Sequence, residues 1–246
     1  MGYLFGKLEA KNSYKTLRFD EFVESTLAPP PLTYNAFEIA RTKIATTPSI
    51  DILCPMDGND RYGDCVAAGL VHAIAINQAL IGKWDVLPEA QVIALYFKLS
   101  GGQDSGLVML DTLNYWRKNR VAGDNILGYA KLDKRNHVAV KQAIKIFGGV
   151  YLGFQVQQNA MSDFEAHRTW TPGRLLNAGH CVYAYAYDDA TVTVSTWAAG
   201  QKGTWAWWDQ CVDESYVLLA PETLVAGFSP GFNFAAFQKA LKEVTA

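Results

Sequence analysis

The chain has 246 residues, with 22 Lys and Arg against 24 Asp and Glu, so its formal net charge at pH 7 is -2. This balance excludes the strongly basic surface that binding to nucleic acids or to anionic membranes requires. Hydrophobic residues make up 50% of the chain and aromatic residues 13%, which excludes a disordered protein and provides for a large core.

The N-terminal residues 1–53 are expected to form an arm and a linker, followed by one domain over 54–246. The run Pro29-Pro30-Pro31 must be extended, because each ring fixes φ and removes a backbone donor, so it separates an amphipathic arm from the rest of the chain. The start of the chain, Met1 to Lys7, lacks the basic stretch and apolar stretch of a secretory signal, and no long apolar window occurs. We therefore expect neither a signal peptide nor a membrane-spanning helix.

Helical spacing predicts a helical half over about residues 54–147. Apolar residues recur at intervals of three and four from Cys65 to about Ile81, and Asp64 or Gly63 is placed to cap this helix. Further helices are expected over 88–99, 109–121 and 136–147.

Alternating apolar and polar residues then predict a sheet half over about 148–220, with strands at 150–156, 180–187, 191–197 and 216–219. Asp188-Asp189 is expected to be a two-residue turn between the second and third of these strands. Asn233 is placed to cap a final helix, within 232–244. Helices first and strands later predict an α+β fold rather than alternating βαβ units.

Cys65 is the residue whose position most directly indicates chemistry. A thiol at a helix start is close to the positive end of the helix dipole and to unpaired backbone N–H groups, which stabilise a thiolate and an oxyanion. The alternative is a small buried hydrophobic residue, which is common for free cysteines. The four cysteines form no CxxC pair and the four histidines no HxxxH pair, so we expect no disulfide framework, no metal site and a reducing compartment.

A thiol nucleophile needs an imidazole, and the chain offers four histidines. His72 lies about two helical turns, or roughly 10 Å, from the thiol, so we expect it to be a hydrogen-bonded helix residue. His137 and His167 stand in polar surroundings, whereas His180 opens an apolar strand and is the candidate base. With a two-residue turn, Ser195 would be a diagonal neighbour of His180, while a three-residue turn would point Ser195 away.

In the order of these residues the sequence resembles the papain-like cysteine peptidases. The family pattern is a Gln six residues before a nucleophilic Cys that starts a long helix, then a His opening a strand, then an Asn-Ser-Trp-Gly run on the next strand. The corresponding residues here are Asn59, Cys65, His180 and the run Ser195-Thr196-Trp197-Ala198. The resemblance covers about residues 54–220 and implies two lobes, one helical with a central helix starting at the Cys and one an antiparallel, barrel-like sheet.

The departures from the family pattern are each expected to weaken catalysis. Asn59 is one methylene shorter than the family Gln, and Ser195 replaces the Asn that orients the imidazole. Asp64 places a carboxylate beside the thiol, which opposes the thiolate unless that carboxylate caps the helix. Ala198 replaces the family Gly.

The resemblance implies a hydrolase without a cofactor, in which Cys65 and His180 cleave a peptide or isopeptide bond. Asn59 would help to hold the oxyanion, Ser195 would orient the imidazole and Trp197 would shield that contact from water. The loop containing Gly101, Gly102 and Gly106 lies where the family binds substrate backbone, although it can equally be a plain loop between helices.

Two other functions stay open at this stage. The amino-acid sequence of residues 58–65 and 230–233 resembles papain-fold proteins of bacteriophages most. This resemblance implies the host cytoplasm or the virion as the location. The altered Asn59, Ser195 and Ala198 favour the alternative of a weakened or inactive structural or binding component of a phage particle, with virion proteins as partners instead of a peptide substrate. A sugar- or peptide-binding module rests only on the many aromatic residues, which more often pack cores.

Overall fold

The computed structural model describes residues 4–9, 16–121, 123–222 and 231–245. Its helices are α1 (Ala36–Thr42), α2 (Ile50–Leu53), α3 (Cys65–Leu80), α4 (Glu89–Leu99), α5 (Met109–Lys118), α6 (His137–Phe147), α7 (Ala160–Glu165), α8 (Trp205–Cys211) and α10 (Phe234–Thr245), with a 3-10 turn η1 (Phe19–Phe22). Within the described ranges, no helix is long and apolar enough to cross a membrane.

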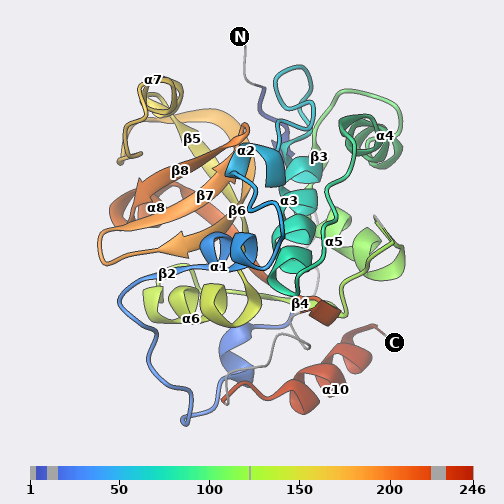
Figure 1. The fold of residues 1–246 in the computed structure, drawn as a ribbon, viewed down its shortest axis with the longest axis vertical. Coiled ribbons are helices and arrows are strands. Elements are labelled where there is room, and N and C mark those ends of the chain that lie inside the picture. The colour runs from blue at the N-terminus through green and yellow to red at the C-terminus, as the bar shows by residue number, and fades with distance from the viewer. Residues whose placement is uncertain (1–3, 10–15, 122, 223–230, 246) are drawn as a thin grey trace.

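Seven strands form one antiparallel sheet. In the order β4-β9-β5-β6-β7-β8 they are β4 (Gly128–Lys131), β9 (Val212–Leu219), β5 (Val150–Gln157), β6 (Leu175–Tyr187), β7 (Thr191–Thr196) and β8 (Ala199–Thr204), and β2 (Tyr34–Asn35) also pairs with β6. A separate parallel pair joins β1 (Lys7–Leu8) to β3 (Leu107–Val108). Figure 1 shows the sheet and α8 on the left and α3, α4 and α5 on the right, with the N-terminal arm entering between them at the top.

The central helix α3 is buried along its whole length because it packs against β6. Gly69 makes this close approach possible, since a Cβ there would lie 3.2 Å from the Tyr151 ring and 3.5 Å from the sulfur of Cys181. Cys181 and Tyr183 of β6 face α3 and belong to one core. Val182 and Ala184 point to the opposite face of the sheet and belong to a second core, under α6 and α8. The expected α+β architecture, with a helical part and an antiparallel sheet part, is confirmed.

The elements that the sequence predicted most accurately are those with long, regular patterns. The helix expected from Cys65 to about Ile81 runs from Cys65 to Leu80, and the one expected over 136–147 begins after Asn136, whose side chain accepts a hydrogen bond from Ala139. Tyr34–Leu53, assigned to the arm and linker, contains β2, α1 and α2, and Phe37, Ala40 and Leu53 are core residues. The sequence pattern does not predict β1, β3, β4, α7, β8 or α8, and β4 lies within the stretch expected to be helical.

The turn between β6 and β7 lies one residue further along the chain than expected. The Asp188 carboxylate accepts hydrogen bonds from the backbone of Ala190 and Thr191, and the Asp188 amide donates to the Thr191 carbonyl at 2.8 Å. Tyr187 therefore pairs with Val192 instead of Ala190, and a bulge nearer the middle of the hairpin shifts the register again. The displaced turn leaves alternate residues on the same faces, whereas the bulge changes which residue of β7 faces the candidate histidine.

Candidate active site

Cys65 is the first residue of α3, as the sequence predicted. Asp64 precedes it, but its side chain makes no capping hydrogen bond to the helix, contrary to that expectation. The Asp64 carboxylate instead accepts a hydrogen bond of 3.0 Å from the amide of Asn59. Burial raises the pKa of the Asp64 carboxyl to about 7, although the Asn59 hydrogen bond acts in the opposite direction.

The thiol of Cys65 is fully buried and protonated at neutral pH in this arrangement. Burial raises its pKa to about 11, while hydrogen bonds from the backbone of Gly6 and Cys181 act to lower it. The Cys181 contact brings the sulfur to the residue that follows His180 on β6. The fold thus places the thiol against the strand that carries His180.

His180 lies on β6 opposite Phe154 of β5 and is 1% exposed. Its Nε2 lies 2.9 Å from Oγ1 of Thr196, and its Nδ1 has no hydrogen-bond partner in the part of the chain that the structure describes. The ring of Trp197 stacks on the imidazole with centroids 4.5 Å apart and an interplanar angle of 18°. Burial lowers the pKa of His180 to about 3, with a smaller effect from His72, so the imidazole is neutral.

Thr196, and not Ser195, is the partner of His180, which corrects the expectation from the sequence. Ser195 lies opposite Tyr183, and its hydroxyl lies 3.2 Å from Nδ1 of His72 and donates to the Tyr183 carbonyl. The cause is the bulge between Ala184 and Ala186, because consecutive strand residues point to opposite faces and a shift of one residue exchanges them. Finding Thr196 required the position of the bulge between Ala184 and Ala186, because the displaced turn alone leaves Ser195 on the face of His180.

His72 is a hydrogen-bonded helix residue, as expected. Its Nε2 lies 3.0 Å from the Pro55 carbonyl and 3.1 Å from Oδ2 of Asp57, and both His72 and Asp57 are buried. Together with the Ser195 contact, these contacts connect α3 to the loop before it and to β7. Ser195 is the residue of β7 that precedes Thr196, the partner of His180.

Asn59 is buried near the start of α3, and its side-chain amide faces three acceptors. Besides Asp64, these are the carbonyls of Tyr62 at 3.3 Å and of Leu4 at 3.4 Å. The Leu4 contact shows that the Asn59 amide reaches a backbone carbonyl of the N-terminal arm, despite the shorter side chain.

Residues 4–8 of the N-terminal arm cover the Cys65 and His180 side chains. The Phe5 ring lies 5.7 Å from the His180 ring and 6.1 Å from the Trp197 ring, edge to face in both cases. The Gly6 carbonyl accepts a hydrogen bond of 2.7 Å from Leu107, where the arm pairs with β3. The backbone of the arm at Gly6 donates a hydrogen bond to the Cys65 thiol, so the arm occupies the space next to the sulfur.

Glycines make this close seating of the arm possible. A Cβ on Gly6 would lie 1.6 Å from the Gly63 carbonyl oxygen, and one on Gly106 would lie 2.3 Å from the Gly6 oxygen. Gly106 therefore does contact an extended backbone, as the sequence analysis considered. Gly101 and Gly102 have no atom within 4 Å of an added Cβ, so the structure does not bring them to the arm.

Comparison with known proteins finds similarity in structure but not in sequence. No family model matches the chain, and no curated protein matches it significantly. Xylellain, a cysteine protease from Xylella fastidiosa, superposes with a TM-score of 0.64 at 14% identity, over 88% of this chain and 96% of that one. Digestive procathepsin L 3 of Tenebrio molitor larval midgut gives 0.58 at 13% identity, over 85% of this chain and 76% of that one.

A third similar structure contains the cysteine protease and lectin-like domains of Cwp84, a surface layer associated protein of Clostridium difficile. Its TM-score is 0.58 at 14% identity, over 88% of this chain and 55% of that one. At these identities the similarity establishes the architecture alone, and this chain has the two-lobed α+β fold of the papain-like proteins.

Proposed function

We propose that this chain is a papain-like cysteine hydrolase that cleaves a peptide or isopeptide bond. The observation that carries the proposal is the local arrangement of two residues. Cys65 is the first residue of the central helix, and His180 lies on the adjoining strand. Nε2 of His180 is hydrogen-bonded to Thr196, and its Nδ1 has no hydrogen-bond partner among the described residues. Structural similarity to several cysteine proteases supports the same chemistry.

The proposed reaction follows from these atoms once the arm leaves the cleft. With its proton on Nε2 and directed to Thr196, the imidazole accepts the Cys65 proton at Nδ1. The thiolate attacks the carbonyl carbon, and the tetrahedral oxyanion is held by the Cys65 backbone N–H and the Asn59 amide. The imidazolium then protonates the leaving amine. Water hydrolyses the thioester, releasing the acid product and restoring the thiol and neutral imidazole.

The arm makes the proposed enzyme inactive as it stands, because it buries both reacting side chains. Burial keeps the thiol protonated and the imidazole neutral, so no thiolate-imidazolium pair forms under the arm. Access of a substrate requires residues 4–8 to move. The non-catalytic alternative, the bacteriophage origin and a place in the virion stay predictions from the sequence.

The test uses the full-length Gly6→Ala variant, in which the added Cβ prevents the arm from seating against Gly63. Labelled casein hydrolysis is measured together with the pH dependence of Cys65 alkylation by iodoacetamide, read by peptide mass spectrometry, with the other cysteines as internal controls. We expect casein cleavage that Cys65→Ser abolishes, and Cys65 labelling below pH 7 that His180→Ala slows. No cleavage, with Cys65 labelled like the other thiols, would contradict the proposal.

A further inference from the structure

Lys7 of the arm occupies a narrow pocket next to the candidate active site. Its side chain is 2% exposed, and it follows Gly6, whose backbone contacts the Cys65 thiol. The lysine stem lies over two glycines of the sheet lobe. A Cβ on Gly153 would lie 2.2 Å from Cε of Lys7, and one on Gly179 would lie 3.3 Å from its Cβ. Any side chain at either glycine would fill the space that the stem now uses.

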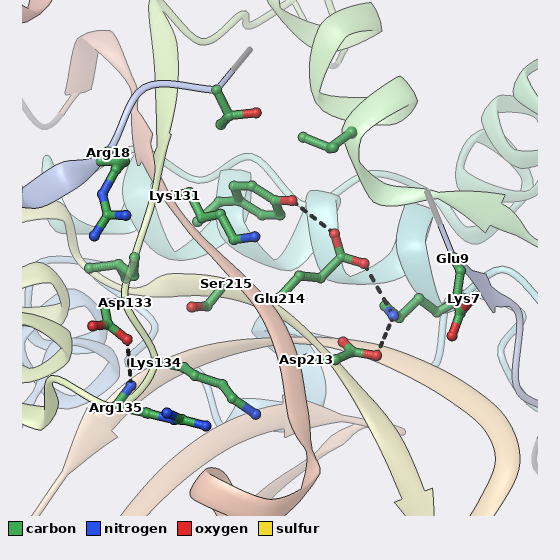
Figure 2. A pocket seen from close by; sticks show the side chains of 14 residues that line it. Lys7, Glu9, Arg18, Lys131, Asp133, Lys134, Arg135, Asp213, Glu214 and Ser215 are labelled. Carbon is green, nitrogen blue, oxygen red and sulfur yellow. Dashed lines mark hydrogen bonds and ion pairs between the residues drawn. The ribbon is translucent and has the colours of Figure 1, made fainter. Parts of the chain in front are cut away.

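Two carboxylates form the end of this pocket. The ammonium group of Lys7 lies 2.8 Å from Oδ2 of Asp213 and 3.1 Å from Oε1 of Glu214, as Figure 2 shows. Neutral donors orient both carboxylates independently of the lysine. Gln155 donates to Asp213 at 3.1 Å, and the Tyr216 hydroxyl donates to Glu214 at 2.9 Å. The two acidic groups are therefore held in place by β5 and β9, whether or not Lys7 is present.

We propose that the Lys7 pocket, defined by Gly153, Gly179, Asp213 and Glu214, selects peptide substrates with a Lys or Arg side chain within two residues of the scissile bond. This inference rests on the proposed function, because the pocket gains its meaning from its closeness to Cys65. An extended peptide advances about 3.3 Å per residue. Because Lys7 directly follows the residue whose backbone contacts the Cys65 thiol, a peptide in the place of the arm with a carbonyl carbon at the sulfur brings a side chain within two residues of that carbon to the pocket.

The chemistry of the pocket favours a cation over a neutral side chain. Burial alone would lower the pKa of Lys7, yet Asp213 and Glu214 outweigh it and hold that pKa above its ordinary value. A neutral side chain of the same length would fill the space over the glycines and leave the 12% exposed Glu214 and the 31% exposed Asp213 without a counter-charge. Because hydrogen bonds to charged groups are stronger than those between neutral groups, we expect lysine to be preferred over a neutral side chain of the same length on the order of 10- to 100-fold in Kd.

The pocket opens into a cavity of about 940 Å³, which leaves room for the longer arginine side chain. Asp133 lines the far end of this cavity, where it accepts a hydrogen bond from the backbone of Arg135 (Figure 2). Asp133 therefore supplies a matched control, since it is a carboxylate of the same cavity that takes no part in holding Lys7.

The test measures binding separately from turnover. The protein is the full chain with Gly6→Ala and Lys7→Met, which take the arm out of the cleft, and Cys65→Ala, which prevents reaction. The probes are fluorescein-labelled peptides copying residues 4–9, with lysine, arginine or norleucine at the fourth position, and fluorescence polarisation gives Kd. We expect the two basic peptides to bind at least tenfold more tightly than the norleucine peptide. Adding Asp213→Asn and Glu214→Gln removes this difference, and adding Asp133→Asn preserves it.

A parallel cleavage assay uses the same peptides with the protein that retains Cys65. Equal binding of the lysine and norleucine peptides, or no binding of either, would overturn the pocket inference and leave the proposed hydrolase untouched. Lysine-selective binding without cleavage of any peptide or of casein would overturn the proposed function while the pocket stands. Selective binding and selective cleavage together would support both.

Discussion

Replacing Asp64 with asparagine is expected to stabilise the protein at neutral and alkaline pH. The Asp64 side chain is completely buried, and one of its oxygens, Oδ2, has no hydrogen-bond partner among the described residues. Its pKa lies near 7 in the folded protein, against an ordinary value of 3.8. Because each pKa unit corresponds to about 1.36 kcal/mol, ionising this group costs the folded state about 4 kcal/mol relative to the unfolded state.

The sign of the pH dependence follows from proton binding. Between about pH 4 and pH 7 the folded protein holds the Asp64 proton and the unfolded chain does not, so the free energy of unfolding falls as the pH rises. This stability is fully present below about pH 4 and is lost once the pH passes about 7. In Asp64→Asn the group no longer titrates, while the amide oxygen can still accept the Asn59 hydrogen bond.

Urea unfolding of the wild type and Asp64→Asn at intervals from pH 4 to pH 8 measures this effect. We expect the two free energies of unfolding to be similar at pH 4 and to separate by up to about 4 kcal/mol in favour of the variant at pH 8. Asp189→Asn, at an exposed position of the hairpin turn, serves as the control and should follow the wild type. Parallel pH profiles for the wild type and Asp64→Asn would refute the reasoning.

The remaining predictions concern access to the thiol and the orientation of the imidazole. Gly6→Ala is expected to speed Cys65 alkylation by iodoacetamide on the order of tenfold or more, because displacing the arm exposes the buried thiol. Leu8→Ala, at a position 43% exposed, is the control and should leave the rate unchanged. Equal rates for both variants would contradict the covering role of the arm. In the Gly6→Ala background, Thr196→Val should lower kcat for casein about 10- to 100-fold and Thr196→Ser should retain most of it, because the hydroxyl holds Nε2 of the base. Ser195→Ala should lower the melting temperature without moving the pH profile of kcat, and a shifted profile would assign Ser195 a role at the base.

The sequence predicted those parts of the fold in which local pattern and packing agree. The helix starting at Cys65 was found because a run of turn formers precedes a long apolar segment, and the structure ends it within a residue of the expected position. The contact of Thr196 with His180 was missed because it depends on the bulge between Ala184 and Ala186 of β6, which simple alternation along a strand does not predict. An error of one residue in a strand exchanges the two faces, which is why Ser195 was chosen in place of Thr196.

β8 and α8 were missed for a different reason. Ala199–Thr204 contains two glycines and has little apolar alternation, so its strand character comes from pairing with β7. Trp205–Cys211 follows a threonine whose hydroxyl accepts a hydrogen bond from the Trp207 amide. The tryptophans of this helix are buried, in keeping with the general tendency of aromatic residues to pack cores. Composition thus predicted their burial, while the local pattern did not predict the element that carries them.

The arm over the site is the feature for which the sequence carried no local signal. Lys7 pairs with Leu107 and contacts Asp213 and Glu214, so its position depends on residues far away along the chain. Because these contacts hold the arm over the site, the protonation states of Cys65 and His180 depend on where the arm lies. Moving the arm returns water to Cys65 and His180, which removes the main cause of the high thiol pKa and the low imidazole pKa. The two pKa values are then expected to move toward each other, so in the proposed hydrolase uncovering the cleft would both admit a peptide and favour the thiolate needed to attack it.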